Sequence, residues 1–91
     1  MVPVEDSRVL IVDDDTETLE LLREIVSKEG YKIDTAEHAQ AALAKIEVAR
    51  PDVVITDLHM PGMDGLALLS ELKTRSPETL VILLTAYGSL K

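Results

Sequence analysis

Two apolar stretches of this 91-residue chain stop abruptly at carboxylates, and this feature constrains the fold more than any other. The run 9–12 meets three consecutive aspartates that begin at Asp13, and the run 53–56 meets Asp57. Short β-branched runs bounded by turn formers are typical of buried strands. In an open parallel sheet, functional groups gather at the carboxyl ends of the strands. If the two strands are neighbours, Asp13, Asp14 and Asp57 converge, and such like charges call for a cation, a proton or a phosphoryl group.

Strand-like and helix-like patterns alternate along the whole chain. Apolar residues recur with helical spacing between the strand-like runs, and turn formers separate the segments. We expect strands over residues 8–12, 31–36, 53–57 and 80–85, and helices over 16–29, 39–49 and a segment that follows Asp64 and ends before Pro77. Such alternation produces parallel strands joined by right-handed helical crossovers, which is an α/β fold.

The helical spacing also predicts which residues face the core and which cap the helices. In the first helix, Asp15 or Thr16 is a suitable N-cap, and Gly30 is well placed to end it. The expected inward residues are Leu19, Leu22, Ile25 and Val26 in the first helix and Leu66, Leu69 and Leu72 in the third. The two histidines, His38 and His59, are expected in solvated loops.

Composition argues against several classes of function. The formal net charge is -8, and the aromatic residues are limited to Tyr31 and Tyr87, so the cations and stacking platforms of nucleic-acid binders are lacking. The longest apolar run, residues 80–84, is far too short to span a membrane. The acidic segment 1–6 does not resemble a signal peptide, and the lack of cysteine fits a cytoplasmic protein.

Three motifs at the predicted strand ends resemble those of the receiver domain of two-component response regulators. They are Val-Asp-Asp-Asp at 12–15, Thr-Asp-Leu-His-Met-Pro-Gly-Met-Asp-Gly at 56–65 and Leu-Leu-Thr-Ala at 83–86. The second motif is the most specific, and the chain is most similar to the receivers of nitrogen-regulation-type transcriptional activators. The resemblance implies a flavodoxin-like fold of three layers with a parallel sheet in the strand order 2-1-3-4.

The resemblance also implies a metal site. Asp57 would accept a phosphoryl group from a histidine kinase, and Asp13 and Asp14 would bind Mg²⁺ together with it. Asp14 would bind the ion directly and Asp13 mainly through water, while His59 would offer its backbone carbonyl; Mn²⁺ is an alternative ion. Oxygen ligands of this kind are those that Mg²⁺ prefers.

Two residues after the fourth predicted strand complete the implied site. Thr85 matches the hydroxyl residue that hydrogen-bonds the phosphoryl group, and Ala86 matches the small residue that leaves room for it. The expected function is therefore signal transduction in a phosphorelay, and not enzymatic turnover.

The family pattern is incomplete within this sequence. A receiver continues after the fourth strand through a helix, a fifth strand and a final helix, whereas the sequence stops at Lys91. We therefore expect one receiver domain over residues 1–91, truncated and without the family's lysine at the end of strand five. A positioned cation is worth about 3 kcal/mol to a charged transition state, so phosphorylation is expected to be impaired. The strand at 80–85 would be an exposed aliphatic edge, which predicts a homo-oligomer that covers it.

Three other classes of function are alternatives to a phosphorylated receiver. A haloacid-dehalogenase-type phosphatase places its aspartates in the pattern Asp-x-Asp-x-Thr/Val, but here Glu17 stands where Thr or Val belongs. A calcium-binding EF-hand loop is rejected, because Thr18 occupies the position that needs glycine. The remaining alternative is a non-catalytic receiver fragment that serves as a structural or dimerisation module and keeps a vestigial acidic pocket.

Overall fold

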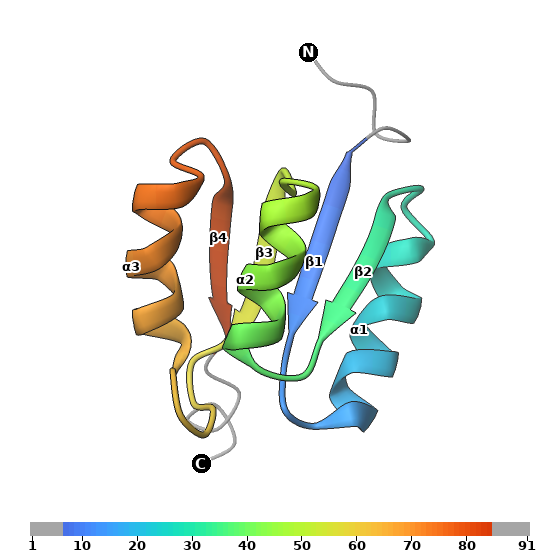
Figure 1. The fold of residues 1–91 in the computed structure, drawn as a ribbon. Coiled ribbons are helices and arrows are strands. Elements are labelled where there is room, and N and C mark those ends of the chain that lie inside the picture. Colours follow the sequence, from blue (N-terminus) through green and yellow to red (C-terminus); the bar gives the residue numbers. More distant parts are fainter. Residues whose placement is uncertain (1–6, 85–91) are drawn as a thin grey trace.

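Strands and helices alternate in the computed structural model, which describes residues 7–84 of the chain (Figure 1). The elements are β1 (Arg8–Val12), α1 (Thr16–Ser27), β2 (Lys32–Ala36), α2 (Ala39–Val48), β3 (Val53–Asp57), α3 (Gly65–Arg75) and β4 (Leu80–Leu84). The strands form one sheet in the order β2-β1-β3-β4, and each neighbouring pair is parallel. The predicted α/β fold and strand order are confirmed.

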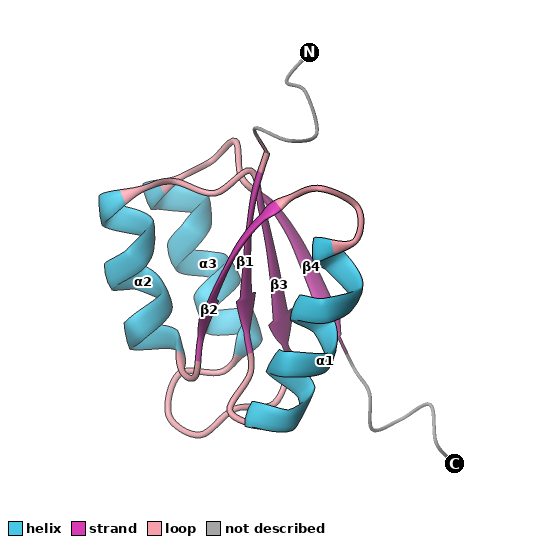
Figure 2. Cartoon of the chain, turned by 90° about the vertical axis from the view of Figure 1, so that its right-hand side faces the viewer, coloured by secondary structure: helices cyan, strands magenta, loops and turns pink. Residues whose placement is uncertain are grey.

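The sheet lies between two layers of helices. Helices α2 and α3 cover one face, and α1 lies on the other (Figure 2). Because successive side chains of a strand point to opposite faces, β1 contributes to both layers of the core. Leu10 and Val12 pack in the cluster beneath α2 and α3, whereas Val9 and Ile11 pack with Leu19 of α1.

Two residues that were predicted to face the core lie on the surface. In α1, Ile25 is 52% exposed, because the helix packs over β1 and β2 and leaves that side uncovered. In α3, Leu66 is 56% exposed, whereas Leu68 is fully buried. The inward residues of α3 are Gly65, Leu68 and Leu72, so the helix is rotated about its axis relative to the prediction.

Side chains cap the starts of the helices. Asp64 caps α3, since its Oδ1 accepts a hydrogen bond from Ala67 N at 2.9 Å. Helix α2 begins after His38, whose Nδ1 accepts a hydrogen bond from Ala41 N at 3.1 Å. His38 is exposed, as expected, but it is a helix cap and not simply a loop residue.

The register of the sheet determines which residues meet at its carboxyl end. Val9 of β1 pairs with Val53 of β3, and Val12 pairs with Thr56. The next residue of each strand segment is an aspartate, so Asp13 and Asp57 lie beside each other. Within residues 7–84, no helix is both long and apolar enough to cross a membrane.

Candidate metal centre at the carboxyl end of the sheet

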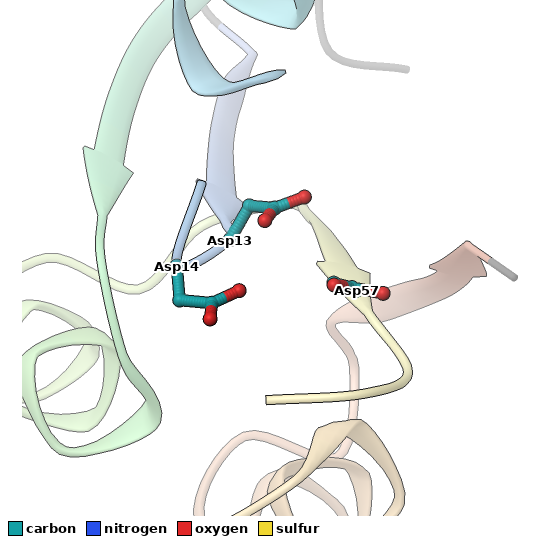
Figure 3. Close-up of side chains that lie close together, drawn as sticks. All are labelled: Asp13, Asp14 and Asp57. Atoms are coloured by element: carbon teal, nitrogen blue, oxygen red, sulfur yellow. The ribbon is translucent and has the colours of Figure 1, made fainter. Parts of the chain in front are cut away.

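Three carboxylates converge where β1 and β3 end. Asp13 and Asp14 follow β1 directly, and Asp57 is the last residue of β3. One carboxylate oxygen from each of the three lies within 4.8 Å of the others, and the side chains point toward a common space (Figure 3). Within residues 7–84, no lysine or arginine forms an ion pair with any of them. The predicted convergence is confirmed, and no basic side chain of the described residues balances these like charges.

Asp13 is the buried member of the cluster. Its residue is only 6% exposed, whereas Asp14 is exposed and Asp57 is half-buried. Burial raises the pKa of Asp13, and the charges of the neighbouring aspartates raise it further, while the hydrogen bond from Asp15 N opposes them. Ionisation of Asp13 is therefore less favourable than that of an ordinary aspartate, and a bound divalent cation would oppose this effect.

The turn after Asp13 is fixed by hydrogen bonds to both of its neighbouring elements. Asp13 N donates to Ala36 O at 3.1 Å, which continues the β1–β2 ladder, and Asp13 Oδ1 accepts from Asp15 N at 2.9 Å. The side chain of Asp15 caps α1 by accepting a hydrogen bond from Glu17 N. This is the structural role that the sequence predicted for Asp15.

The loop after Asp57 is held by close backbone contacts. Asp57 Oδ1 accepts a hydrogen bond from His59 N at 3.2 Å, and Gly65 N donates to Leu58 O at 3.0 Å. A Cβ atom at position 65 would lie 2.5 Å from Asp57 O, so glycine is required there for the start of α3 to approach the end of β3. The position of Asp57 therefore depends on the conformation of the loop that follows it.

A cavity of about 310 Å³ opens over the three carboxylates. Besides the aspartates, its lining includes Thr18, His59 and Leu84. Neither Thr18 nor Leu84 was predicted to line this site. Thr18 reaches it from the first turn of α1, and Leu84 lies there because it pairs with Asp57 in the sheet. The predicted role of the His59 backbone carbonyl stays a prediction, and the expected site residues Thr85 and Ala86 lie outside the described residues.

The chemistry of the donors fits a hard divalent cation. The cluster offers only carboxylate oxygens, one of them largely withdrawn from water, and Mg²⁺ prefers oxygen ligands combined with retained waters. Neither nitrogen nor sulfur ligands belong to the cluster, which disfavours the softer metals.

Comparison with known proteins identifies the family. A model of the response regulator receiver domain matches residues 9–91, nearly the whole chain. The chain belongs to the response regulator receiver domain family. Receivers are signalling modules of two-component systems, and they bind Mg²⁺ at an acidic aspartate cluster like the one described here.

Relatives in two kinds of protein support this assignment. The chain is 40% identical over 85 residues to sporulation initiation phosphotransferase F of Bacillus subtilis, a match that covers 93% of this chain and 68% of that protein. It is also 40% identical over 82 residues to the DNA-binding transcriptional regulator NtrC of Salmonella typhimurium. That second match covers 90% of this chain but only 18% of NtrC, so the chain corresponds to a small part of such a regulator.

Solved structures show the same fold. The response regulator TrrA from Thermotoga maritima, in complex with Mg²⁺-BeF, superposes with a TM-score of 0.85 at 42% identity. This match covers 93% of the present chain and 74% of the TrrA chain. TrrA in complex with the histidine kinase ThkA superposes with a TM-score of 0.82 at 44% identity, covering 89% of this chain and 70% of that one.

Proposed function

We propose that this receiver accepts a phosphoryl group on Asp57 from a histidine kinase, with Mg²⁺ bound by Asp13, Asp14 and Asp57. The observation that carries the proposal is the convergence of the three carboxylates at adjacent strand ends within 4.8 Å. A relative, TrrA, has been solved both with Mg²⁺-BeF and with the histidine kinase ThkA, which supports the choice of ion and partner. A cytoplasmic location is proposed on the same basis.

The three aspartates have different tasks in this proposal. Exposed Asp14 and half-buried Asp57 would be direct ligands, and buried Asp13 would act mainly through a water molecule. When bound, the divalent ion balances the charge of the cluster and of the phosphoryl oxygens. His59 lines the same cavity and is proposed to add its backbone carbonyl.

Asp57 is the nucleophile in the proposed transfer. Its Oδ1 accepts the hydrogen bond from His59 N, so we assign the bond to phosphorus to Oδ2. That bond forms while the phosphorus–nitrogen bond of the kinase phosphohistidine breaks, and the departing imidazole keeps the electron pair and then takes up a proton. Hydrogen bonds within the segment from Asp57 to Gly65 hold the attacking carboxylate in place, and positioning is a main contribution of a protein to phosphoryl transfer.

The phosphoacceptor assignment can be tested by labelling with a small phosphodonor. We expect acetyl phosphate with Mg²⁺ to add a base-labile phosphoryl group that intact-mass and peptide mapping locate on Asp57. The variant D57N should remain unlabelled, whereas D52N, which changes an aspartate at the other end of the same strand, should label like the parent. Equal labelling of D57N and the parent chain would reject the assignment.

Labelling is proposed to be slow when residues 1–91 are used as an isolated polypeptide. Thr85 and Ala86 match the family motif after β4, but no residue in this sequence matches the family's lysine of strand five. A direct comparison is a chimera in which residues 1–91 are followed by the corresponding final helix-strand-helix of TrrA. The chimera should be labelled faster, by about a hundredfold for a cation worth about 3 kcal/mol. Equal rates would show that the lysine is not needed.

We also propose that residues 1–91 self-associate through β4. In the described part of the chain β4 is an outer strand of the sheet, its sequence is wholly aliphatic, and Leu80 and Ile82 are 61% and 42% exposed. The other outer strand, β2, is different: Lys45 Nζ binds Asp34 Oδ1 and Thr35 O there, and Asp34 Oδ1 accepts Thr35 N. Charged groups protect an edge against pairing, and aliphatic edges invite it.

Solution mass tests the self-association. Light scattering at micromolar concentration should give a mass above that of one 10.0 kDa chain, and I82K should lower it toward the monomer. A matched change on the protected edge, T35K, should leave the mass unaltered. A monomeric parent chain would contradict the proposal.

The alternative of a non-catalytic module with a vestigial pocket makes the opposite prediction for metal binding. Amide spectra of a working receiver should show saturable shifts at Asp14 and Asp57 when Mg²⁺ is added, and a vestigial site should show none. The phosphatase alternative gains no support, because the family match is to receivers along nearly the whole chain.

A further inference from the structure

Asp15 contacts the carboxylate cluster without belonging to it. It lines the cavity over the cluster, but its carboxylate is not one of the three that converge. Its backbone N–H donates to Asp13 Oδ1 at 2.9 Å. Asp13 is the least exposed of the three aspartates, so the direction of its carboxylate depends on the few groups that reach it inside the protein.

The position of this N–H is fixed by the first turn of α1. Asp15 Oδ1 accepts from Glu17 N at 3.1 Å, and Asp15 Oδ2 accepts from Thr18 Oγ1 at 2.8 Å. The backbone carbonyl of Asp15 accepts from Leu19 N at 3.1 Å. Leu19 is only 5% exposed and anchors the helix on the sheet.

We propose that Asp15, supported by Thr18, is a positioning residue for the metal centre. Its side chain holds the start of α1 so that its backbone N–H binds one oxygen of Asp13 and leaves the other to bind a water molecule of the ion. The inference rests on the proposed function, because it assumes that the cluster binds a divalent cation. Groups that orient a metal ligand by hydrogen bonding contribute to affinity although they do not touch the metal.

A positioning role and a purely electrostatic role of Asp15 predict different effects of substitutions on Mg²⁺ affinity. If Asp15 acted only as an additional negative charge near the ion, D15N would weaken binding as much as D15A. If it acts by capping, D15N and D15S should bind nearly as well as the parent, because asparagine and serine are also good N-caps and alanine is not. Conservative rescue therefore separates the two roles.

The experiment is a Mg²⁺ titration of the full 91-residue chain followed by amide shifts, with each variant first shown to be folded. We expect D15A to weaken the affinity about tenfold, the lower end of the range for groups that orient a metal ligand, and D15N to stay within about threefold of the parent. T18V, which removes one of the two cap hydrogen bonds, should fall between them. This variant keeps the test decisive if D15A fails to fold.

A matched control distinguishes positioning from general loss of a helix cap. H38A removes the N-cap of α2, whose side chain does not line the carboxylate cavity, and should leave the Mg²⁺ affinity unchanged. Three results would overturn the inference: an unchanged affinity of D15A, equal losses in D15A and D15N, or equal losses in D15A and H38A. Each leaves the proposed function standing, whereas failure of the parent chain to bind Mg²⁺ would reject the proposed function itself.

Discussion

An aspartate stands at each end of β3, and the two have different surroundings. Asp52, just before the strand, is bound to its neighbours: its N donates to Arg8 O and its Oδ2 accepts from Arg8 N, both at 2.9 Å, and its O accepts from Leu80 N at 3.0 Å. Asp57, at the other end, lies among carboxylates that no lysine or arginine of residues 7–84 balances. Residue type alone therefore does not distinguish an aspartate that is hydrogen-bonded to a neighbouring strand from one that lies in a carboxylate cluster.

Other polar groups in the loops at the amino end of the sheet are also hydrogen-bonded to one another. Thr79 Oγ1 donates to Pro51 O at 2.8 Å and lies 2.6 Å from Ser76 Oγ, and Ser76 is only 4% exposed. These groups connect the loops before β3 and β4. At this end polar side chains connect the loops, whereas at the carboxyl end three carboxylates converge with no lysine or arginine of residues 7–84 paired to them.

The largest effect on stability is expected from adding a side chain at Gly65, where α3 lies against Asp57. In G65A the new Cβ would meet Asp57 O at 2.5 Å, so we expect a loss of about 2–3 kcal/mol in the free energy of unfolding and a disturbed metal site. The measurement is chemical denaturation together with Mg²⁺ affinity.

A glycine in the preceding loop provides the control for that experiment. Gly62 has φ +76° but has open space around its missing Cβ, so G62A should cost only about 1 kcal/mol, from backbone strain. If the two variants were equally stable, the close approach of α3 to β3 would have no energetic importance.

A smaller effect is expected at the amino end. D52A removes the acceptor of the Arg8 N–H and should lower the free energy of unfolding by about 1 kcal/mol. Mg²⁺ affinity should not change, because Asp52 does not belong to the metal centre. D52N, which keeps an oxygen acceptor, should recover most of the loss. A change in Mg²⁺ affinity in either variant would erase the contrast between the two ends.

The pH dependence of stability should reveal the cost of ionising Asp13 in the folded protein. Since the pKa of Asp13 is raised in the folded protein, its ionisation costs stability as pH rises from the ordinary carboxyl range through the raised value. Without Mg²⁺, D13N should therefore be more stable than the parent near neutral pH, and the advantage should shrink on acidification. Denaturation curves at several pH values measure this. An advantage that persisted in acid would assign the effect to packing and not to charge.

The smallest effect on stability is expected at Asp34, which is paired with Lys45. Its pH dependence has the opposite sign to that of Asp13. Partial burial opposes ionisation of Asp34, but the hydrogen bonds from Lys45 Nζ and Thr35 N, together with the positive charges of Lys45 and Arg23, outweigh it and lower the pKa of Asp34. Its contribution should be present above the ordinary carboxyl range and be lost as pH falls. Both side chains are well exposed, at 43% and 63%, so K45M should cost less than about 1 kcal/mol. A larger loss would mean that this pair supports the β2 edge.

The strands and the carboxylate cluster could be predicted from the sequence because their signals are local. Residues 9–12 and 53–55 are aliphatic, an aspartate follows each within two residues, and the predicted strands 8–12 and 53–57 match β1 and β3 at both bounds. Parallel alternation then places their ends at one edge of the sheet. Convergence of Asp13, Asp14 and Asp57 followed from topology and not from any side-chain detail.

The orientation of α3 could not be predicted in this way. Leucines occupy positions 66, 68, 69 and 72, so apolar residues lie on more than one face of the helix. The contact of Gly65 with Asp57 O selects the face that includes Leu68 and excludes Leu66. His38 was also missed as a cap, because histidine is not among the residues that usually cap helices. Both features depend on contacts between elements or on an unusual residue choice.

The most direct test of the account is to locate a divalent ion on the folded chain. Mn²⁺ added in small amounts broadens the amide signals of residues near its binding site. We expect the signals of residues 13–15 and 57–59 to broaden first, while those of Asp52 and Thr79 at the other end of the sheet stay sharp, and excess Mg²⁺ should restore them. Broadening spread evenly over the acidic surface, or centred away from Asp13, Asp14 and Asp57, would contradict the account.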